Sequence, residues 1–195
     1  MIVGICGLIG SGKGTVADFL VNDKGFTKLS FADKLKDSVA TLFDWPRELL
    51  EGDTEESRQW REQEDIFWSK ELSQPVTPRF VLQLYGTECM RNGFYDGIWV
   101  SFVKKKILDN PKQNFIIPDT RFPNEINVLH ELGGEVWWIR RGELPSWWNI
   151  AVIGETPPGI HASEYAWAMP DDKFDRVVYN DGTKEELFKS LQFVD

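Results

Sequence analysis

The chain has 195 residues, a formal net charge of −9 and a hydrophobic fraction of 42%. This length and composition predict one compact domain over residues 1–195, with a core of ordinary size and room for an insertion and a lid. The acidic balance lacks the basic face that a DNA or RNA polymer requires, so we expect no such partner. It does not exclude a small anionic ligand, because a few cations focused in a cleft suffice.

The cysteines and the first residues indicate a reducing compartment. Cys6 and Cys89 are the only cysteines and there are two histidines, so neither a disulfide framework nor a His/Cys metal site can be built. The apolar stretch 1–6 has no basic residues before it and is far too short to cross a bilayer. We therefore expect a cytoplasmic protein with no membrane contact.

A glycine-rich stretch, GLIGSGKGT at 7–15, follows the apolar run 1–6 and precedes a segment with apolar residues at helical spacing. Strand, glycine loop and helix form the setting in which backbone N–H groups and a helix N-terminus surround phosphates. The spacing fits a nucleotide-binding loop, and GSGKGT is the form found in adenylate kinase and its relatives. The residues expected to bind the phosphates are Gly10, Ser11, Gly12, Lys13, Gly14 and Thr15.

One position departs from the usual loop pattern. Gly14 stands where Ser or Thr is usual, and Thr15 comes one place later, so the hydroxyl contact to Mg²⁺ is open. The alternative interpretation of the whole stretch is a glycine-rich strand-to-helix turn with an exposed Lys13.

The next segment continues an α/β pattern. Residues 26–31 alternate like a short strand, and 32–43 have apolar residues at helical spacing. Strand, helix, strand, helix is the opening of a parallel sheet, whose ligands bind beyond the carboxyl ends of the strands. Lys36 then belongs at the edge of the site; the alternative is an ordinary strand–helix junction with solvated lysines.

Residues of about 44–76 interrupt this pattern with many acidic side chains and four interspersed aromatic residues. A helix over 58–72 is predicted, with Trp60, Glu64 and Phe67 on one face. We interpret the stretch as a helical insertion that is mobile over the acceptor site, or as a surface for a second subunit in a homodimer.

Two further helices are predicted after the insertion. The first begins near Thr77, with Pro78 in its first turn, and contains Gly86, where something must approach closely. The second starts at about 96–99 and ends at 110–111.

A buried strand, 114–118, ends at Asp119 and is followed by Arg121 and Glu125. A carboxylate at the tip of the strand beside the nucleotide loop is placed to hold Mg²⁺, usually through water. Asp119 is alternatively interpreted as a cap of the next helix, near Pro123, and the two roles are compatible. Arg121 and Glu125 would then face the site.

The last third contains a strand, a long irregular segment and a final strand and helix. The strand 135–141 ends in Arg140 and Arg141, and the segment of about 141–170 is dense in Gly and Pro, as expected of a lid. The two arginines either clamp phosphates or pair with Glu143 or Glu164. Residues 174–179 predict the last strand and 183–191 a capped final helix.

Six stretches together resemble the deoxynucleoside monophosphate kinases of bacteriophages, within the P-loop nucleoside monophosphate kinases. The resemblance implies an α/β, three-layer P-loop kinase fold, with a parallel sheet flanked by helices. Where that family commonly has Asp, this chain has Gly14. The matching stretches follow the family's order and are GSGKGTVADF (10–19), SFADKLKD (30–37), PRFVLQLYGTE (78–88), DGIWV (96–100), IIPDTRFPNE (116–125) and VVYNDGTKEELF (177–188).

The resemblance implies transfer of the γ-phosphoryl group of ATP, with Mg²⁺, to a 2′-deoxynucleoside 5′-monophosphate. Asn180 and Gly182 would lie by the donor adenine, and Asp119 would hold the metal. The expected catalytic residues are Lys13, Asp119, Arg121 and Arg140. The expected acceptor-binding residues are Lys36, Arg79, Gly86, Thr87, Trp99, Arg121 and Glu125.

Phosphoryl transfer needs in-line placement of two anions and neutralised charge, but no general base, because the attacking phosphate oxygen is already ionised. As a hypothesis, Trp99 packs against the sugar and excludes a 2′-hydroxyl. Two other functions fit the same residues: another small-molecule P-loop kinase, similar to dephospho-CoA kinase, or a regulator that binds nucleotide without turnover.

Overall fold

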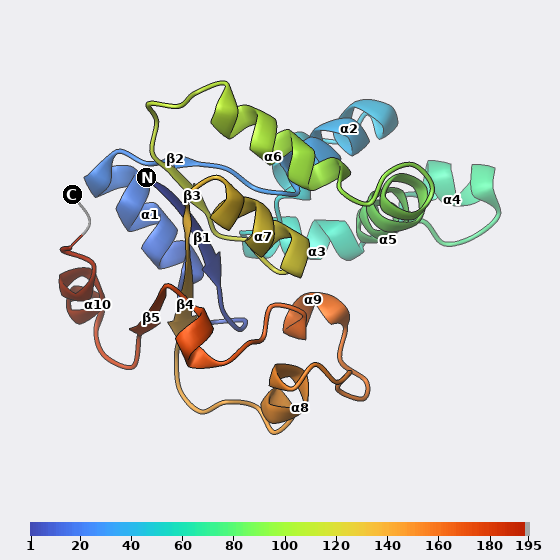
Figure 1. Ribbon diagram of the computed structural model, residues 1–195. Helices are drawn as coiled ribbons and strands as arrows, with labels where there is room; N and C mark the ends of the chain where they lie inside the picture. Colours follow the sequence, from blue (N-terminus) through green and yellow to red (C-terminus); the bar gives the residue numbers. More distant parts are fainter. Residues whose placement is uncertain (194–195) are drawn as a thin grey trace. The chain divides into compact units, whose positions relative to one another are not determined.

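The computed structural model describes residues 1–193 (Figure 1). The chain divides into two compact units. Unit 1 comprises Met1–Ser30 and Val103–Asp195, and unit 2 comprises Phe31–Phe102. Each unit has its own cluster of buried apolar side chains.

Unit 1 contains a five-stranded sheet in which every neighbouring pair is parallel. The strand order is β2-β3-β1-β4-β5, so the strand before the glycine loop is central. The predicted parallel α/β sheet is therefore confirmed, although the strand expected over 26–31 is reduced to two residues. The strands are β1 Ile2–Cys6, β2 Thr27–Lys28, β3 Phe115–Ile117, β4 Glu135–Arg140 and β5 Arg176–Tyr179.

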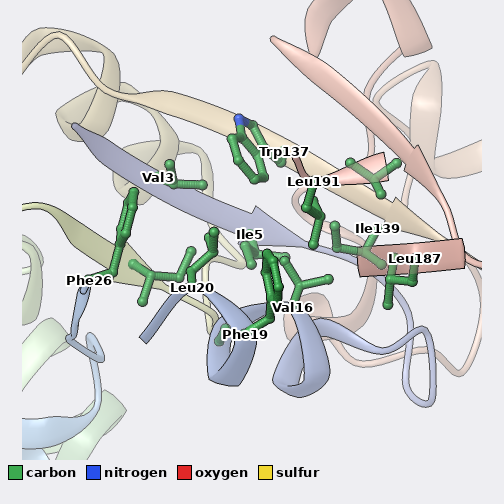
Figure 2. Packing of buried hydrophobic residues seen from close by; sticks show 13 residues of the cluster. Val3, Ile5, Val16, Phe19, Leu20, Phe26, Trp137, Ile139, Leu187 and Leu191 are labelled. Carbon is green, nitrogen blue, oxygen red and sulfur yellow. The ribbon is translucent and has the colours of Figure 1, made fainter. Parts of the chain in front are cut away.

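Helices lie on both faces of this sheet. Figure 2 shows the core on one face, where Val16 and Leu20 of α1 and Leu187 and Leu191 from the C-terminal segment pack on strand residues such as Ile5. The unit 1 helices are α1 Lys13–Lys24, α7 Pro123–Glu131, α8 Trp148–Val152, α9 Ala162–Tyr165, η3 Asp171–Lys173 and α10 Lys184–Ser190.

On the other face, Leu129 of α7 lies so close to Gly4 of β1 that a Cβ at Gly4 would collide with it. The three-layer arrangement implied by the resemblance is thus present in unit 1. Helix α6, Ile98–Leu108, begins in unit 2 and ends in unit 1. None of the helices within residues 1–193 has the length and apolar character that a bilayer crossing demands.

The segment after β4, expected to be irregular, is anchored by aromatic side chains. Trp138 of β4 stacks on Trp148 of α8, with ring centroids 4.8 Å apart and an interplanar angle of 15°. Trp167 and Phe174 pack on the same indole at 6.1 and 5.2 Å. These rings fix the ends of the segment to the sheet, since aromatic pairs add to the free energy of burial.

Unit 2 is helical within its described residues, and its core contains Val39, Trp45, Leu50, Val76 and Val81. Thr77 caps α5, and Pro78 is at its first position, as predicted. Beyond Gln83, however, the backbone opens into the wider turns of a π-helix. Its elements are α2 Asp33–Phe43, η1 Arg47–Leu50, α3 Glu55–Glu62, α4 Ile66–Leu72, α5 Pro78–Gln83 and the π-helix η2 Leu84–Asn92.

The single helix predicted over 58–72 is wrong, because the chain forms α3 and α4 with a break between them. The carboxylate of Asp65 accepts the backbone N–H of Trp68 at 3.0 Å and the indole N–H of Trp45 at 2.8 Å. A side chain that caps a new helix and satisfies a buried indole favours a break over a continuous helix.

Most aromatic residues of 44–76 pack inside unit 2. Trp45 stacks on Phe43 at 4.6 Å, and Trp60 and Trp68 contact the same pair edge-on. Phe67 differs, with 63% of its surface exposed. These contacts account for three of the four aromatic residues that suggested a dimer surface, and the homodimer stays a prediction.

Candidate active site

The glycine loop has the setting that the sequence predicted, between β1 and α1. It contains a turn in which Ser11 N donates to the carbonyl of Leu8 at 3.1 Å. Gly12 has φ +98°, and a Cβ there would collide with the side chain of Asn180. Only glycine satisfies both conditions at this position.

Lys13 folds back onto the loop. Its Nζ donates to the carbonyl oxygens of Gly7 at 2.6 Å and Leu8 at 2.8 Å. Burial, and after it the nearby charge of Arg121, lower the pKa of Lys13 to about 8, while the charge of Glu164 acts in the opposite direction. The two carbonyl contacts hold the side-chain nitrogen of Lys13 inside the loop.

The end of β5 supports the loop from outside. Asn180 is buried, and its Nδ2 donates to the carbonyl of Ser11 at 2.9 Å. Ser11 itself is 2% exposed, and its Oγ has no hydrogen-bond partner among the described residues. A buried hydroxyl without a partner is a group that a bound phosphate would satisfy.

A small pocket of about 180 Å³ opens beside the loop. It includes the predicted Asn180 and Gly182 and adds two cations, Arg141 and Lys184, that the sequence did not assign there. Its lining residues are Thr15, Arg141, Asn180, Gly182, Lys184 and Leu187.

Asp119 follows β3, the direct neighbour of β1. Its carboxylate accepts a hydrogen bond from Ser30 Oγ at 2.6 Å. The N-cap position of α7 belongs to Phe122, so the alternative role of Asp119 as the helix cap is wrong. Within residues 1–193 no group of three or more acidic, His or Cys side chains could hold a metal on its own.

The start of α7 carries the other predicted pair. Glu125 is buried, and its carboxylate accepts the backbone N–H groups of Arg121 at 2.7 Å and Phe122 at 3.1 Å. These bonds stabilise the first turn of α7, because the N–H groups at the start of a helix have no acceptor within the helix. The Arg121 guanidinium is exposed and lies 3.8 Å from the carboxylate of Glu164.

Arg140 is held by its surroundings. Its guanidinium lies over the rings of Trp138 at 5.3 Å and Tyr179 at 5.6 Å, and pairs with Asp171 at 3.5 Å. For Arg140, the expected ion pair with Glu143 or Glu164 is wrong, because its partner is Asp171. Its catalytic role stays a prediction, and Arg141 is the arginine that lines the pocket.

The predicted acceptor residues Lys36, Arg79, Gly86, Thr87 and Trp99 all belong to unit 2. Lys36 pairs with Glu51 at 2.6 Å, and Glu51 also pairs with Arg47. Arg79 is exposed and pairs with Glu62 at 2.8 Å. Thr87 is exposed on η2.

Gly86 is approached closely, as predicted, but by a neighbouring side chain. A Cβ at Gly86 would lie 2.8 Å from Cδ2 of Leu35 on α2. The indole Nε1 of Trp99 donates to the Gly86 carbonyl at 3.0 Å, and Trp99 is 4% exposed. The indole therefore has a packing role, and its contact with a sugar stays a prediction.

Arg61 of α3 was missed by the sequence analysis. Its guanidinium packs against Gly52, and its buried Nε has no hydrogen-bond partner among the described residues. Burial lowers the pKa of Arg61, and the nearby charge of Arg79 lowers it further. The nearness of Arg61 to the charge of Arg79 is a signal that only coordinates provide.

Comparison with known proteins decides the family. A family model described as deoxynucleotide monophosphate kinase matches residues 49–191. The chain belongs to this family. The match starts well after the glycine loop, so the loop is an independent observation. As a family member, the chain is a phosphotransferase that acts on a nucleotide monophosphate.

Individual relatives agree with the family. The chain is 29% identical over 202 residues to a putative deoxynucleotide monophosphate kinase of Acanthamoeba polyphaga mimivirus, covering 98% of this chain and 94% of the relative. It is 27% identical over 117 residues to the deoxynucleotide monophosphate kinase of Enterobacteria phage T4, covering 58% of this chain and 43% of the relative.

Similarity to solved structures is weaker. The dephospho-CoA kinase of Campylobacter jejuni superposes with a TM-score of 0.46 at 15% identity, covering 100% of this chain and 97% of that chain. A likeness of this size carries no argument about the substrate.

Proposed function

We propose that this protein transfers the γ-phosphoryl group of ATP to a 2′-deoxynucleoside 5′-monophosphate and releases the diphosphate. The main support for this proposal is the glycine loop, which encloses the Lys13 side chain at the carboxyl edge of a parallel sheet. The chain also belongs to this kinase family. The finer assignment is that of a (deoxy)nucleoside-phosphate kinase in the host cytoplasm.

The donor is bound by unit 1. Backbone N–H groups of the loop and the start of α1 receive the phosphates, and Lys13 moves from the carbonyls of Gly7 and Leu8 to the outer phosphate oxygens. The unpartnered hydroxyl of Ser11 gains an acceptor or donor in the same step. The pocket beside Gly182 receives the adenine.

Mg²⁺ fits the residues at the end of β3. The carboxylate of Asp119 and the hydroxyl of Ser30, which donates to it, are oxygen groups, which Mg²⁺ prefers. A single carboxylate suits a metal whose other ligands are water and phosphate oxygens. When bound, the ion supplies neutralisation of the charge that develops on the transferred group.

The acceptor is bound by unit 2. Arg79 and Arg61 are the cations that support a monophosphate site there, since the charge of Arg79 repels that of Arg61 and adds to the effect of burial in lowering the pKa of Arg61. A dianionic phosphate relieves this repulsion and gives the buried Nε of Arg61 a partner. Glu62 is exposed, so its ion pair with Arg79 is readily exchanged for phosphate.

The test is an ADP-coupled assay with ATP, Mg²⁺ and a panel of all common deoxynucleoside and ribonucleoside monophosphates, together with dephospho-CoA and shikimate. We expect turnover with one or more deoxynucleoside monophosphates, and loss of at least 10²-fold in kcat/KM for Lys13→Met. Turnover with dephospho-CoA or shikimate alone would assign another kinase. ATP binding without ADP formation for any acceptor would assign a regulator.

A further inference from the structure

Glu164 is an acidic side chain at a place where a kinase must accept phosphates. It lies on α9 in the segment after β4, and its carboxylate is 3.8 Å from the guanidinium of Arg121. Its negative charge also favours the protonated form of Lys13, against the effects of burial and Arg121 on the pKa of that residue. The carboxylate of Glu164 therefore pairs with Arg121 and also acts on the charge of Lys13.

The fold holds Glu164 in this place. Helix α9 is capped by His161, whose ring Nδ1 accepts the backbone N–H of Ser163 at 3.2 Å. Three residues after Glu164, Trp167 is 2% exposed and packs on Trp148 at 5.2 Å and on Trp138 of β4 at 6.1 Å. The carboxylate is thus positioned by a ring that is buried against the sheet.

A carboxylate and a transferred phosphoryl group compete for the same cations. Both are anions that accept hydrogen bonds from a guanidinium, and like charges at such separations repel strongly where water is partly excluded. A phosphate that binds Lys13 and Arg121 therefore either displaces the carboxylate of Glu164 or binds more weakly because of its charge.

We propose that Glu164 is a positioning residue that occupies the charge position of the transferred phosphoryl group in the nucleotide-free protein and releases Arg121 when a phosphate chain binds. The carboxylate keeps Arg121 oriented toward the loop and screens its repulsion of Lys13. This inference rests on the proposed function, because it takes the loop as the phosphate site.

The experiment measures the dissociation constant of Mg²⁺-free tripolyphosphate by titration calorimetry at low salt. We expect Glu164→Gln to bind tripolyphosphate about five- to tenfold more tightly than the unchanged protein, because a competing charge is removed while the shape is kept. Glu143→Gln is the matched control: it makes the same charge change at an exposed position between β4 and α8, and we expect less than a twofold effect.

A second comparison tests the route through Arg121. In an Arg121→Gln background, Glu164→Gln should gain less than twofold, since the guanidinium that the carboxylate held is gone. A merely structural role of Glu164 would give weaker binding in both backgrounds.

The outcomes separate this inference from the proposed function. If Lys13→Met leaves tripolyphosphate binding unchanged, the loop is not a phosphate site and the proposed function fails. If Lys13→Met removes binding but Glu164→Gln gives no gain over Glu143→Gln, only the role of Glu164 is overturned. If Glu164→Gln gives no gain without Mg²⁺ and loses binding when the titration is repeated with Mg²⁺, Glu164 is a metal ligand and the inference is overturned.

Discussion

At the scale of single residues, the position of Lys13 inside the loop predicts that the affinity for ATP depends on pH. Burial, and after it the charge of Arg121, lower its pKa to about 8, from the 10.5 of a free lysine, and bound phosphates would raise it again. Below pH 8 the ammonium is charged in both free and bound protein. Above pH 8 the free protein loses the proton, so ATP binding must restore it, and affinity falls by at most about tenfold per pH unit.

The measurement is calorimetric titration of ATP at pH 7 and pH 9, in buffers with different ionisation enthalpies. We expect almost no proton uptake at pH 7 and close to one proton at pH 9. Arg at position 13 is the control, because a guanidinium does not titrate in this range. Equal proton uptake by Lys13→Arg at pH 9 would contradict the assignment to Lys13.

Asn180 gives a prediction about loop support. Asn180→Ala removes the donor to the buried carbonyl of Ser11, and a buried acceptor left unpaired costs about 1–3 kcal/mol. We expect an unfolding free energy lower by that amount and a raised KM for ATP, with little change in the KM of the acceptor. Asn127→Ala, at an exposed position of α7, is the matched control and should be neutral in both measurements.

Arg61 gives a prediction about the acceptor. Arg61→Lys keeps the charge but loses the planar fork, so we expect the KM of the acceptor to rise roughly 10- to 100-fold, the equivalent of one charge-assisted hydrogen bond. Arg58→Lys is the control on the same helix, because Arg58 is exposed and pairs with Glu55. Equal kinetics for the two variants would remove Arg61 from the acceptor site.

These residues mark the limit of what sequence predicts at this scale. The loop at 7–15 was predictable because glycine spacing between strand and helix has a local physical meaning. The contact of Asn180 with Ser11 spans 169 residues, and that of Arg121 with Glu164 depends on where a Trp167 ring is buried. No periodicity in the sequence encodes such pairings.

At the scale of elements, η2 is the clearest departure from expectation. Apolar spacing predicted one helix from Thr77, but spacing does not distinguish α from π turns over nine residues. The π-helix brings Gly86 against Leu35 and within reach of the Trp99 indole. π-turns are frequently found at functional sites, which agrees with the acceptor residues expected here.

This packing predicts a non-additive pair. Gly86→Ala places a methyl group 2.8 Å from Leu35, so we expect about 1–3 kcal/mol of destabilisation in urea unfolding. Adding Leu35→Val should recover part of that loss, because the two sites share one volume. Gly14→Ala is the control, since a Cβ at Gly14 meets nothing within 4 Å. If the effects of Gly86→Ala and Leu35→Val on the unfolding free energy were fully additive, the contact between these two residues would be disproved.

At the scale of the whole molecule, the class of fold was predictable and the partition of the chain was not. Buried runs followed by helical spacing predicted a parallel sheet, because such runs need helices on both faces. The compact unit formed by residues 31–102 was not predicted. Its core combines α2 with the acidic stretch 44–76, where a helical insertion or a partner surface was expected.

The core of unit 1 joins the two ends of the chain, so donor binding depends on the last helix. Leu191 is fully buried in the cluster that contains Ile5 of β1 and Val16 of α1 (Figure 2). Leu191→Ala removes this packing, and we expect a loss of about 2–5 kcal/mol in unfolding free energy.

Loss of packing at Leu191 should also disturb the glycine loop, because Asn180, in the turn that precedes α10, donates a hydrogen bond to Ser11. ATP affinity measured in increasing urea should therefore fall earlier for Leu191→Ala than for the unchanged protein. Leu108→Ala, at a position that is 59% exposed, should leave both quantities within about 0.5 kcal/mol. If the two leucine variants unfolded at the same urea concentration, the C-terminal segment could not be part of the core that holds the donor site.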